Sequence, residues 1–119
     1  MMLRKQPKKP RRSARLRCPA HLAWVRRTYL CVAGNKVNWW CEGQIQAAHW
    51  RLGAHAGTGQ KPNDDRVLPL CERHHAEAHR IGEDTFAKRY NLDIPSILAE
   101  LQRLSEPLRR LRMKMRKTA

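Results

Sequence analysis

The apolar positions of the chain predict a small domain of short, mixed elements. Residues 21–29 carry apolar side chains at helical spacing. Residues 47–50 and 66–70 are short apolar runs that predict strands, and residues 53–65, with three glycines and one proline, are typical of a loop. Residues 31–48 have apolar side chains at mixed spacing, so that two short strands or a knuckle-like turn both fit.

The second half of the chain predicts helices. Residues 71–80 are rich in helix formers and predict a helix with an end signal at Gly82, and residues 83–90 predict a further short helix. Pro95 opens a last helix with one apolar face, which Pro107 should kink or end. The residues of that face are Ile97, Leu98, Leu101, Leu104, Leu108 and Leu111.

Charge divides the 119 residues into a nearly neutral body and two basic ends. Residues 1–17 hold 8 basic and no acidic residues, residues 103–119 hold 7 basic and one acidic, and residues 18–102 hold 10 basic and 9 acidic. Such ends attract polyanions by releasing counterions, without reading sequence. Nucleic acid is therefore the first partner to consider and an anionic membrane surface is the second. We expect DNA as the partner and no membrane, with residues 1–17 forming a disordered arm.

The apolar content of the sequence argues against a membrane-spanning protein and against a secreted one. No apolar run approaches the roughly 20 residues that span a bilayer, and no apolar segment of a secretory signal follows the first basic residues. We therefore expect a cytoplasmic protein. In that reducing compartment, its four cysteines would bind a metal or stay free rather than form disulfides.

The strongest chemical signal is the run Cys71-x-x-His74-His75-x-x-x-His79. On a helix, His75 and His79 lie one turn apart and can hold one ion, while Cys71 and His74 have the spacing of a zinc-ligand pair. One helix start could thus serve two metals. Zinc needs two more ligands, for which Cys31 and Cys41 are the first candidates, and Cys18 with His21 is a rival pair.

His49 is a further candidate, because its near-neutral pKa range suits a general base. It ends an apolar stretch that predicts a strand, directly before the glycine-rich loop. On its own, a single histidine in a strand is weak evidence for catalysis.

Taken together, the order of these residues resembles the HNH family of ββα-metal endonucleases, and most closely its small prophage-borne members, which include phage recombination-enhancement nucleases. The likeness covers roughly residues 20–92, and its specific part runs from His49 to His79. It implies an α+β fold with a small zinc-stapled ββα-metal core. The expected division is a basic arm at 1–17, a nuclease domain at 18–92 and a C-terminal helix with a basic tail at 93–119.

The resemblance also implies roles for individual residues. His49 would be the general base, Asp64 the middle residue that orients the loop or the base, and His75 and His79 ligands of a catalytic divalent ion. Structural zinc would take Cys31, Cys41, Cys71 and His74. Arg51 and Lys61 would contact phosphate.

The sequence departs from the family at Ala48, where many members have an acidic metal ligand. A third protein ligand could come from His55, Asp64 or Asp65. The ion could be Mg²⁺, Mn²⁺, Ni²⁺ or Zn²⁺, and histidine ligands favour the transition metals.

The expected function is metal-dependent hydrolysis of DNA, single- or double-stranded, in phage or prophage recombination or DNA processing, with a recombination or replication protein as a possible partner. The alternative is a zinc module that binds nucleic acid without cleaving it. An RNA- or ribosome-associated basic protein ranks last, because it explains the basic ends but not the order of histidines and cysteines. The oligomeric state stays open.

Overall fold

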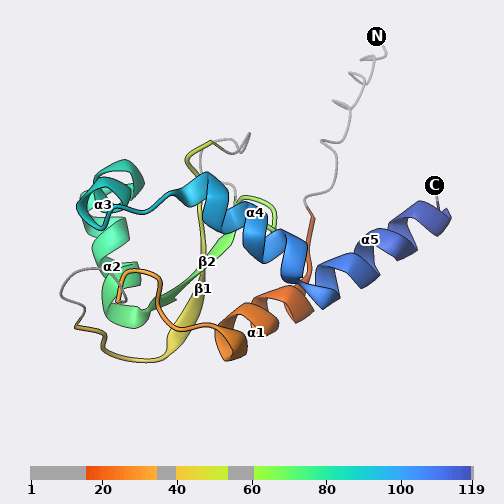
Figure 1. The fold of residues 1–119 in the computed structure, drawn as a ribbon, viewed down its shortest axis with the longest axis horizontal. Coiled ribbons are helices and arrows are strands. Elements are labelled where there is room, and N and C mark those ends of the chain that lie inside the picture. The colour runs from red at the N-terminus through yellow and green to blue at the C-terminus, as the bar shows by residue number, and fades with distance from the viewer. Residues whose placement is uncertain (1–15, 35–39, 54–60, 119) are drawn as a thin grey trace, which may run out of the picture.

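The computed structural model describes residues 16–34, 40–53 and 61–118, which contain five helices and two strands (Figure 1). Both strands and three of the helices lie close to their predicted positions, and the α+β class is confirmed. The elements are α1 (Pro19–Thr28), β1 (Ile45–His49), β2 (Val67–Cys71), α2 (Glu72–Ile81), α3 (Glu83–Arg89), α4 (Ile94–Leu104) and α5 (Glu106–Thr118).

The two strands form an antiparallel pair at the centre of the molecule. The register pairs Ile45 with Cys71 at one end and His49 with Val67 at the other. All of β2 is buried, including Pro69. A proline is tolerated there because the strand pairs with β1 alone in the described sheet.

Helix α2 follows β2 without a loop. Cys71 is both the last residue of β2 and the N-cap of α2, where its sulfur accepts a hydrogen bond from the His74 amide at 3.4 Å. A second set of backbone bonds joins the start of α2 to the chain before β1, since the Glu72 amide donates to the Gln44 carbonyl at 3.1 Å. This sharp transition fixes the direction in which α2 leaves the sheet.

The core lies between the sheet and the helices that follow it. Trp50 and Phe86 are fully buried, with ring centroids 6.2 Å apart, and Leu68 and Leu70 of β2 pack into the same cluster. Helices α1 and α2 both contact the two strands. The two-stranded sheet and the helices packed on it are therefore enough to bury these large side chains.

The predicted last helix is divided into two. It breaks at Ser105, and Pro107 lies in the first turn of α5, where its missing amide hydrogen costs no helical bond. Leu98, Leu101 and Leu108 are buried. The prediction of one continuous apolar face is wrong at Leu104, which is 45% exposed because α5 leaves in a new direction.

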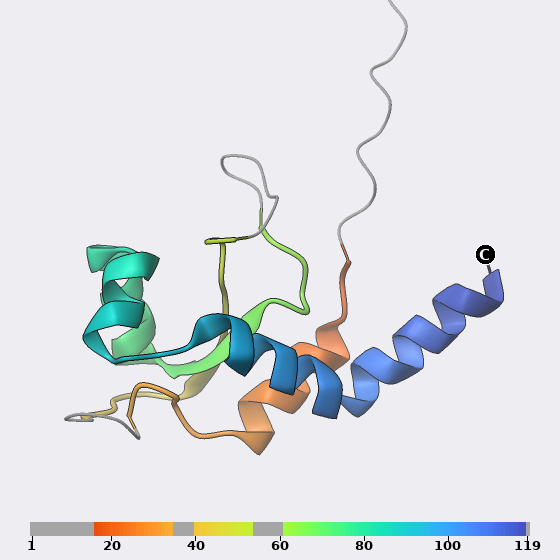
Figure 2. The ribbon, with the colours of Figure 1, turned by 45° about the horizontal axis from the view of Figure 1, so that its top comes forward.

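Helix α5 extends from the body at the end opposite α2 and α3 (Figures 1 and 2). Its start is held by contacts with α1 and with the loop before β2. His21 Nδ1 lies 2.7 Å from Ser105 Oγ, and the Arg112 guanidinium donates to the Asp65 carboxylate at 3.2 Å. Within the described residues, no helix combines the length and apolar character needed to cross a bilayer.

We predict that Leu108→Ala lowers the free energy of unfolding by about 2–4 kcal/mol, because Leu108 is completely buried where α5 joins the body. Leu104→Ala is the matched control, and its half-exposed side chain should cost under about 1 kcal/mol. Denaturant unfolding followed by circular dichroism measures both. Equal losses in the two variants would contradict this packing of α5.

Candidate metal centre and histidine cleft

Four ligand atoms converge where β2 meets α2. The sulfurs of Cys31, Cys41 and Cys71 and a ring nitrogen of His74 all lie within 4.8 Å of one another. Three of these residues are buried, and Cys41 is exposed. The chain enters the cluster through a turn at residues 32–34. Residues 35–39, part of the stretch expected to form two short strands or a knuckle-like turn, lie outside the described part.

The spacing of the four atoms fits a tetrahedral ion. His74 Nδ1 lies 3.1 Å from Cys71 Sγ, 3.4 Å from Cys31 Sγ and 3.7 Å from Cys41 Sγ. With bonds of about 2.3 Å to sulfur and 2.0 Å to nitrogen, tetrahedral zinc separates the two kinds of ligand by about 3.5 Å. Three cysteines and one histidine are also a common donor set for structural zinc. The cluster could therefore hold a structural metal such as zinc.

Glycine is required beside this cluster. A Cβ atom on Gly34 would lie 2.5 Å from Cys41 Sγ, closer than real Cβ contacts. The turn can thus approach the cysteine only without a side chain.

The thiols of the cluster differ in how readily they ionise. Although Cys41 as a whole is exposed, desolvation of its sulfur among the other ligand atoms, and then the neighbouring thiol of Cys31, raise its pKa to about 12. Burial acts in the same direction on Cys71, but the amide hydrogen bonds from His74 and Glu42 outweigh it and lower the pKa of Cys71. A divalent cation is the countercharge that would let both thiols act as thiolates.

The rival zinc pair is separate from the cluster. Cys18 and His21 are buried, but His21 Nδ1 faces Ser105 and the Cys18 amide donates to Asp64 at 2.7 Å. Burial lowers the pKa of His21, which favours the neutral ring in this packing role. The structure thus groups Cys31 and Cys41, not Cys18 and His21, with the Cys71–His74 pair.

His49 is paired with a buried carboxylate. Its Nε2 lies 2.8 Å from Asp64 Oδ1, and the Asp64 side chain is only 5% exposed. Burial tends to raise the pKa of Asp64, but the hydrogen bonds from His49 and from the Cys18 amide outweigh it, so the pKa is lowered. An ionised carboxylate only accepts hydrogen bonds. His49 therefore carries a proton on Nε2, which leaves Nδ1 as the ring nitrogen that does not bind Asp64.

His75 and His79 lie one turn apart on α2. Their Nε2 atoms are 3.1 Å apart, and His75 Nδ1 lies 2.6 Å from Gln46 Oε1 of β1. Two nitrogens bound to one ion at about 2.0–2.1 Å would be about 2.9–3.4 Å apart. The same distance suits a hydrogen bond between the rings, which an ion would replace. Burial, and then His79 and His49, lower the pKa of His75 and keep its ring neutral.

These histidines line one cleft of about 560 Å³. His49 comes from β1, His75 and His79 come from α2, and Arg51 and Lys61 lie at the two sides of the loop between the strands. The structure thus brings five predicted site residues to one hollow, with Asp64 behind His49. His55 lies outside the described residues, and Asp65 binds Arg112 of α5 instead of lining the cleft.

Sequence reasoning missed three residues that position the site. Gln46 orients His75, and the Glu83 carboxylate accepts hydrogen bonds from the amides of Arg51 and Leu52 at 2.8 and 2.6 Å. Arg17 donates to the Pro62 carbonyl at 2.8 Å. The alternation of side chains along β1 could have suggested Gln46. No local pattern marks Glu83 or Arg17, because their partners are 32 and 45 residues away in sequence.

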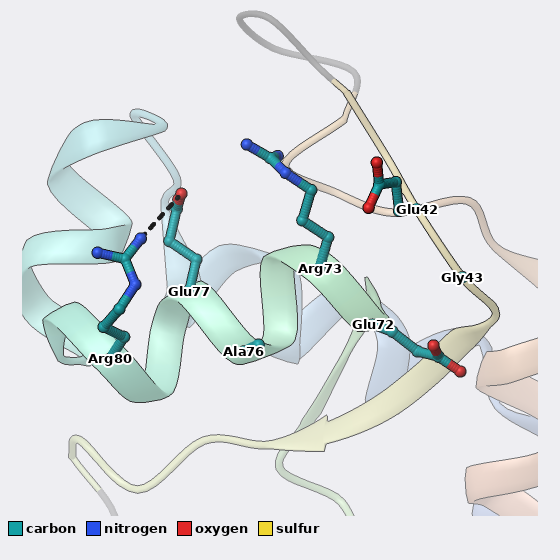
Figure 3. A pocket seen from close by; sticks show the side chains of 7 residues that line it. All are labelled: Glu42, Gly43, Glu72, Arg73, Ala76, Glu77 and Arg80. Carbon is teal, nitrogen blue, oxygen red and sulfur yellow. Dashed lines mark ion pairs between the residues drawn. The ribbon is translucent and has the colours of Figure 1, made fainter.

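A second hollow, of about 630 Å³, lies along another side of α2 (Figure 3). Glu42, Glu72 and Glu77 line it together with Arg73 and Arg80. The buried Glu77 carboxylate lies 3.9 Å from Arg80, and the Arg73 guanidinium donates to the Trp40 carbonyl at 2.8 Å. Glu77 and Arg80 form an ion pair within it, and none of the cleft histidines lines it, so we assign no chemistry to it.

Comparison of the chain with protein-family models, with curated proteins and with solved structures gave no match. The site is therefore interpreted from its own geometry.

We predict that the purified protein holds one zinc ion per chain and that Cys41→Ser loses it, because the serine hydroxyl is a poor zinc ligand. Cys18→Ser, which removes a buried thiol outside the cluster, should keep the zinc. Elemental analysis of both variants after dialysis measures this. Zinc retained by Cys41→Ser, or lost from Cys18→Ser alone, would contradict the ligand set.

Proposed function

We propose that this protein is a metal-dependent DNA endonuclease in which β1, β2 and α2 form a ββα-metal core of the HNH type. The observation that carries the proposal is the cleft itself. It joins an imidazole held by a buried carboxylate to a pair of imidazoles one helical turn apart. A base next to a cation site is the arrangement that phosphodiester hydrolysis requires.

In this proposal His49 acts as the general base. Its Nδ1 accepts a proton from water as the water oxygen bonds to phosphorus and the bond to the leaving oxygen breaks. Asp64 stabilises the imidazolium that results, because its carboxylate accepts the Nε2 proton in a hydrogen bond of 2.8 Å. The leaving oxygen then takes a proton from solvent.

His75 and His79 would hold the divalent ion, and the bound ion would neutralise charge that develops on the phosphate oxygens. Gln46 fixes the His75 ring so that Nε2 points to the ion site. Arg51 and Lys61 would contact the substrate phosphates at the two sides of the loop. Zinc at the Cys31–Cys41–Cys71–His74 cluster would be structural and would hold the start of α2.

A zinc module that binds nucleic acid without cleaving it is the second candidate. The basic ends and the cysteine cluster support it equally well. The pairing of His49 with buried Asp64 favours the nuclease, since a module needs no imidazole oriented by a carboxylate in a cleft.

We predict that plasmid DNA is cleaved in the presence of Mg²⁺, Mn²⁺ or Ni²⁺ and that His49→Ala lowers the rate by about 10²–10⁴. Added imidazole should restore part of the activity, because it can replace the missing base. Circular dichroism and zinc content, both expected to be unchanged, are the controls for folding. Cleavage at the wild-type rate by His49→Ala would remove the base from the mechanism.

We predict that Gln46→Ala raises the Mn²⁺ concentration needed for half-maximal cleavage by about 10–100-fold. The variant releases the His75 ring but leaves both metal ligands and the base in place. Its zinc content should not change, because Gln46 is not one of the four residues of the cluster. An unaltered Mn²⁺ dependence would show that His75 is not a ligand oriented by Gln46.

A further inference from the structure

A groove of about 690 Å³ runs between α1 and α5. It lies where the start of α5 passes α1, at the end of the molecule away from α2 and α3 (Figure 1). Trp24 lines it together with small residues of α1. The proposed hydrolysis makes no use of this groove.

Basic side chains line both sides of the groove. Arg17 and Arg27 come from the α1 side, and Arg110 and Lys114 come from α5. Among the described residues that line the groove, Glu106 is the single carboxylate, and it pairs with Arg110 at 3.4 Å and with Arg109. The groove thus carries four cations and one anion, whereas residues 18–102 of the chain are nearly neutral.

The groove is built before any ligand binds. Leu108 is completely buried beneath the start of α5, and His21 contacts Ser105 where α4 and α5 meet. The ion pair between Arg112 and Asp65 holds α5 further along. A ligand therefore meets two basic walls whose relative position is already fixed, which lowers the entropy cost of binding.

Arg17 connects the groove to the histidine cleft. It lines the groove, and its guanidinium donates to the Pro62 carbonyl at 2.8 Å and lies 3.4 Å from Asp64 Oδ1. Pro62 and Lys61 in turn line the cleft. The two hollows are thus neighbours, joined by a basic side chain.

We propose that the groove between α1 and α5 binds the phosphate backbone of duplex DNA and leads it to the histidine cleft. Two facing basic walls suit a linear polyanion, whereas a membrane surface is flat and could meet only one wall at a time. The inference rests on the proposed function for its biological purpose, but it concerns binding and is tested without cleavage.

The test is fluorescence anisotropy of a labelled 20-base-pair duplex, titrated with the uncleaving His49→Ala protein at several salt concentrations. In this background, Arg27→Ala with Arg110→Ala should weaken binding roughly 10–100-fold at 0.1 M salt. The slope of log K against log salt should become shallower by about 2, because two phosphate contacts are lost.

The matched control is Lys88→Ala with Arg103→Ala. Like the groove variant, it removes two exposed cations. Lys88 pairs with Asp84 and Arg103 pairs with Glu100, and neither cation lines the groove or the cleft. Its affinity should stay within about threefold of the parent. Equal weakening in both double variants would show that only total charge matters and would overturn the proposal.

Two further outcomes would also overturn it. The groove variant could bind the duplex as tightly as its parent, or it could lose binding only to vesicles containing phosphatidylserine, which would assign the groove to a membrane surface. Because this test measures affinity, it separates the two proposals. If the wild-type protein cuts no DNA but the groove variant loses affinity, the nuclease proposal is contradicted and the groove proposal is supported.

Discussion

The structure depends on four ligand atoms at the junction of β2 and α2. Cys71 ends the strand and caps the helix, His74 follows in the first turn, and Cys31 and Cys41 approach from the segment before β1. The His74 ring also packs edge-on against Tyr90, with centroids 5.2 Å apart. An ion bound there would connect three separate stretches of chain, and so set both the position and the rotation of α2. In a domain with a two-stranded sheet, a metal bound there would add stability to the small core.

The rotation of α2 about its own axis determines where the side chains of its later residues lie. With His74 turned into the cluster, the next residue, His75, meets Gln46 of β1, and His79 lies one turn further along. One helix thus serves a buried structural centre and an open cleft. Asp64 performs a similar double task, because its carboxylate binds His49 on one side and the Cys18 amide on the other. The Asp64 side chain therefore connects His49 in the cleft to the chain at Cys18, which follows the basic N-terminal residues.

Much of this arrangement could be predicted from local patterns. The strand around His49, the strand before Cys71 and the two helices that follow depend on periodicity and helix-end signals within a few residues. The sequence offers two pairs that could complete a metal cluster with Cys71 and His74, and it favours Cys31 with Cys41, the pair that the structure places there. Sequence could not show that Cys18 and His21 are packing residues, because their partners Asp64 and Ser105 lie 46 and 84 residues away. The interruption of the last helix could be predicted from Pro107, but the exposure of Leu104 could not, because the apolar spacing continues through the break at Ser105. Arg17 was assigned to a disordered arm, although it contacts the loop beside the cleft. Residues 1–15 of that arm lie outside the described part.

In the proposed enzyme, α2 contributes ligands to two ions of different kinds. Anomalous diffraction from crystals grown with Mn²⁺, recorded at the zinc and manganese edges, tests it most directly. The account predicts a zinc peak among Cys31, Cys41, Cys71 and His74, and a manganese peak in the cleft beside the Nε2 atoms of His75 and His79. A zinc peak without any manganese in the cleft, even with a DNA duplex bound, would contradict the account and leave a zinc module that binds nucleic acid.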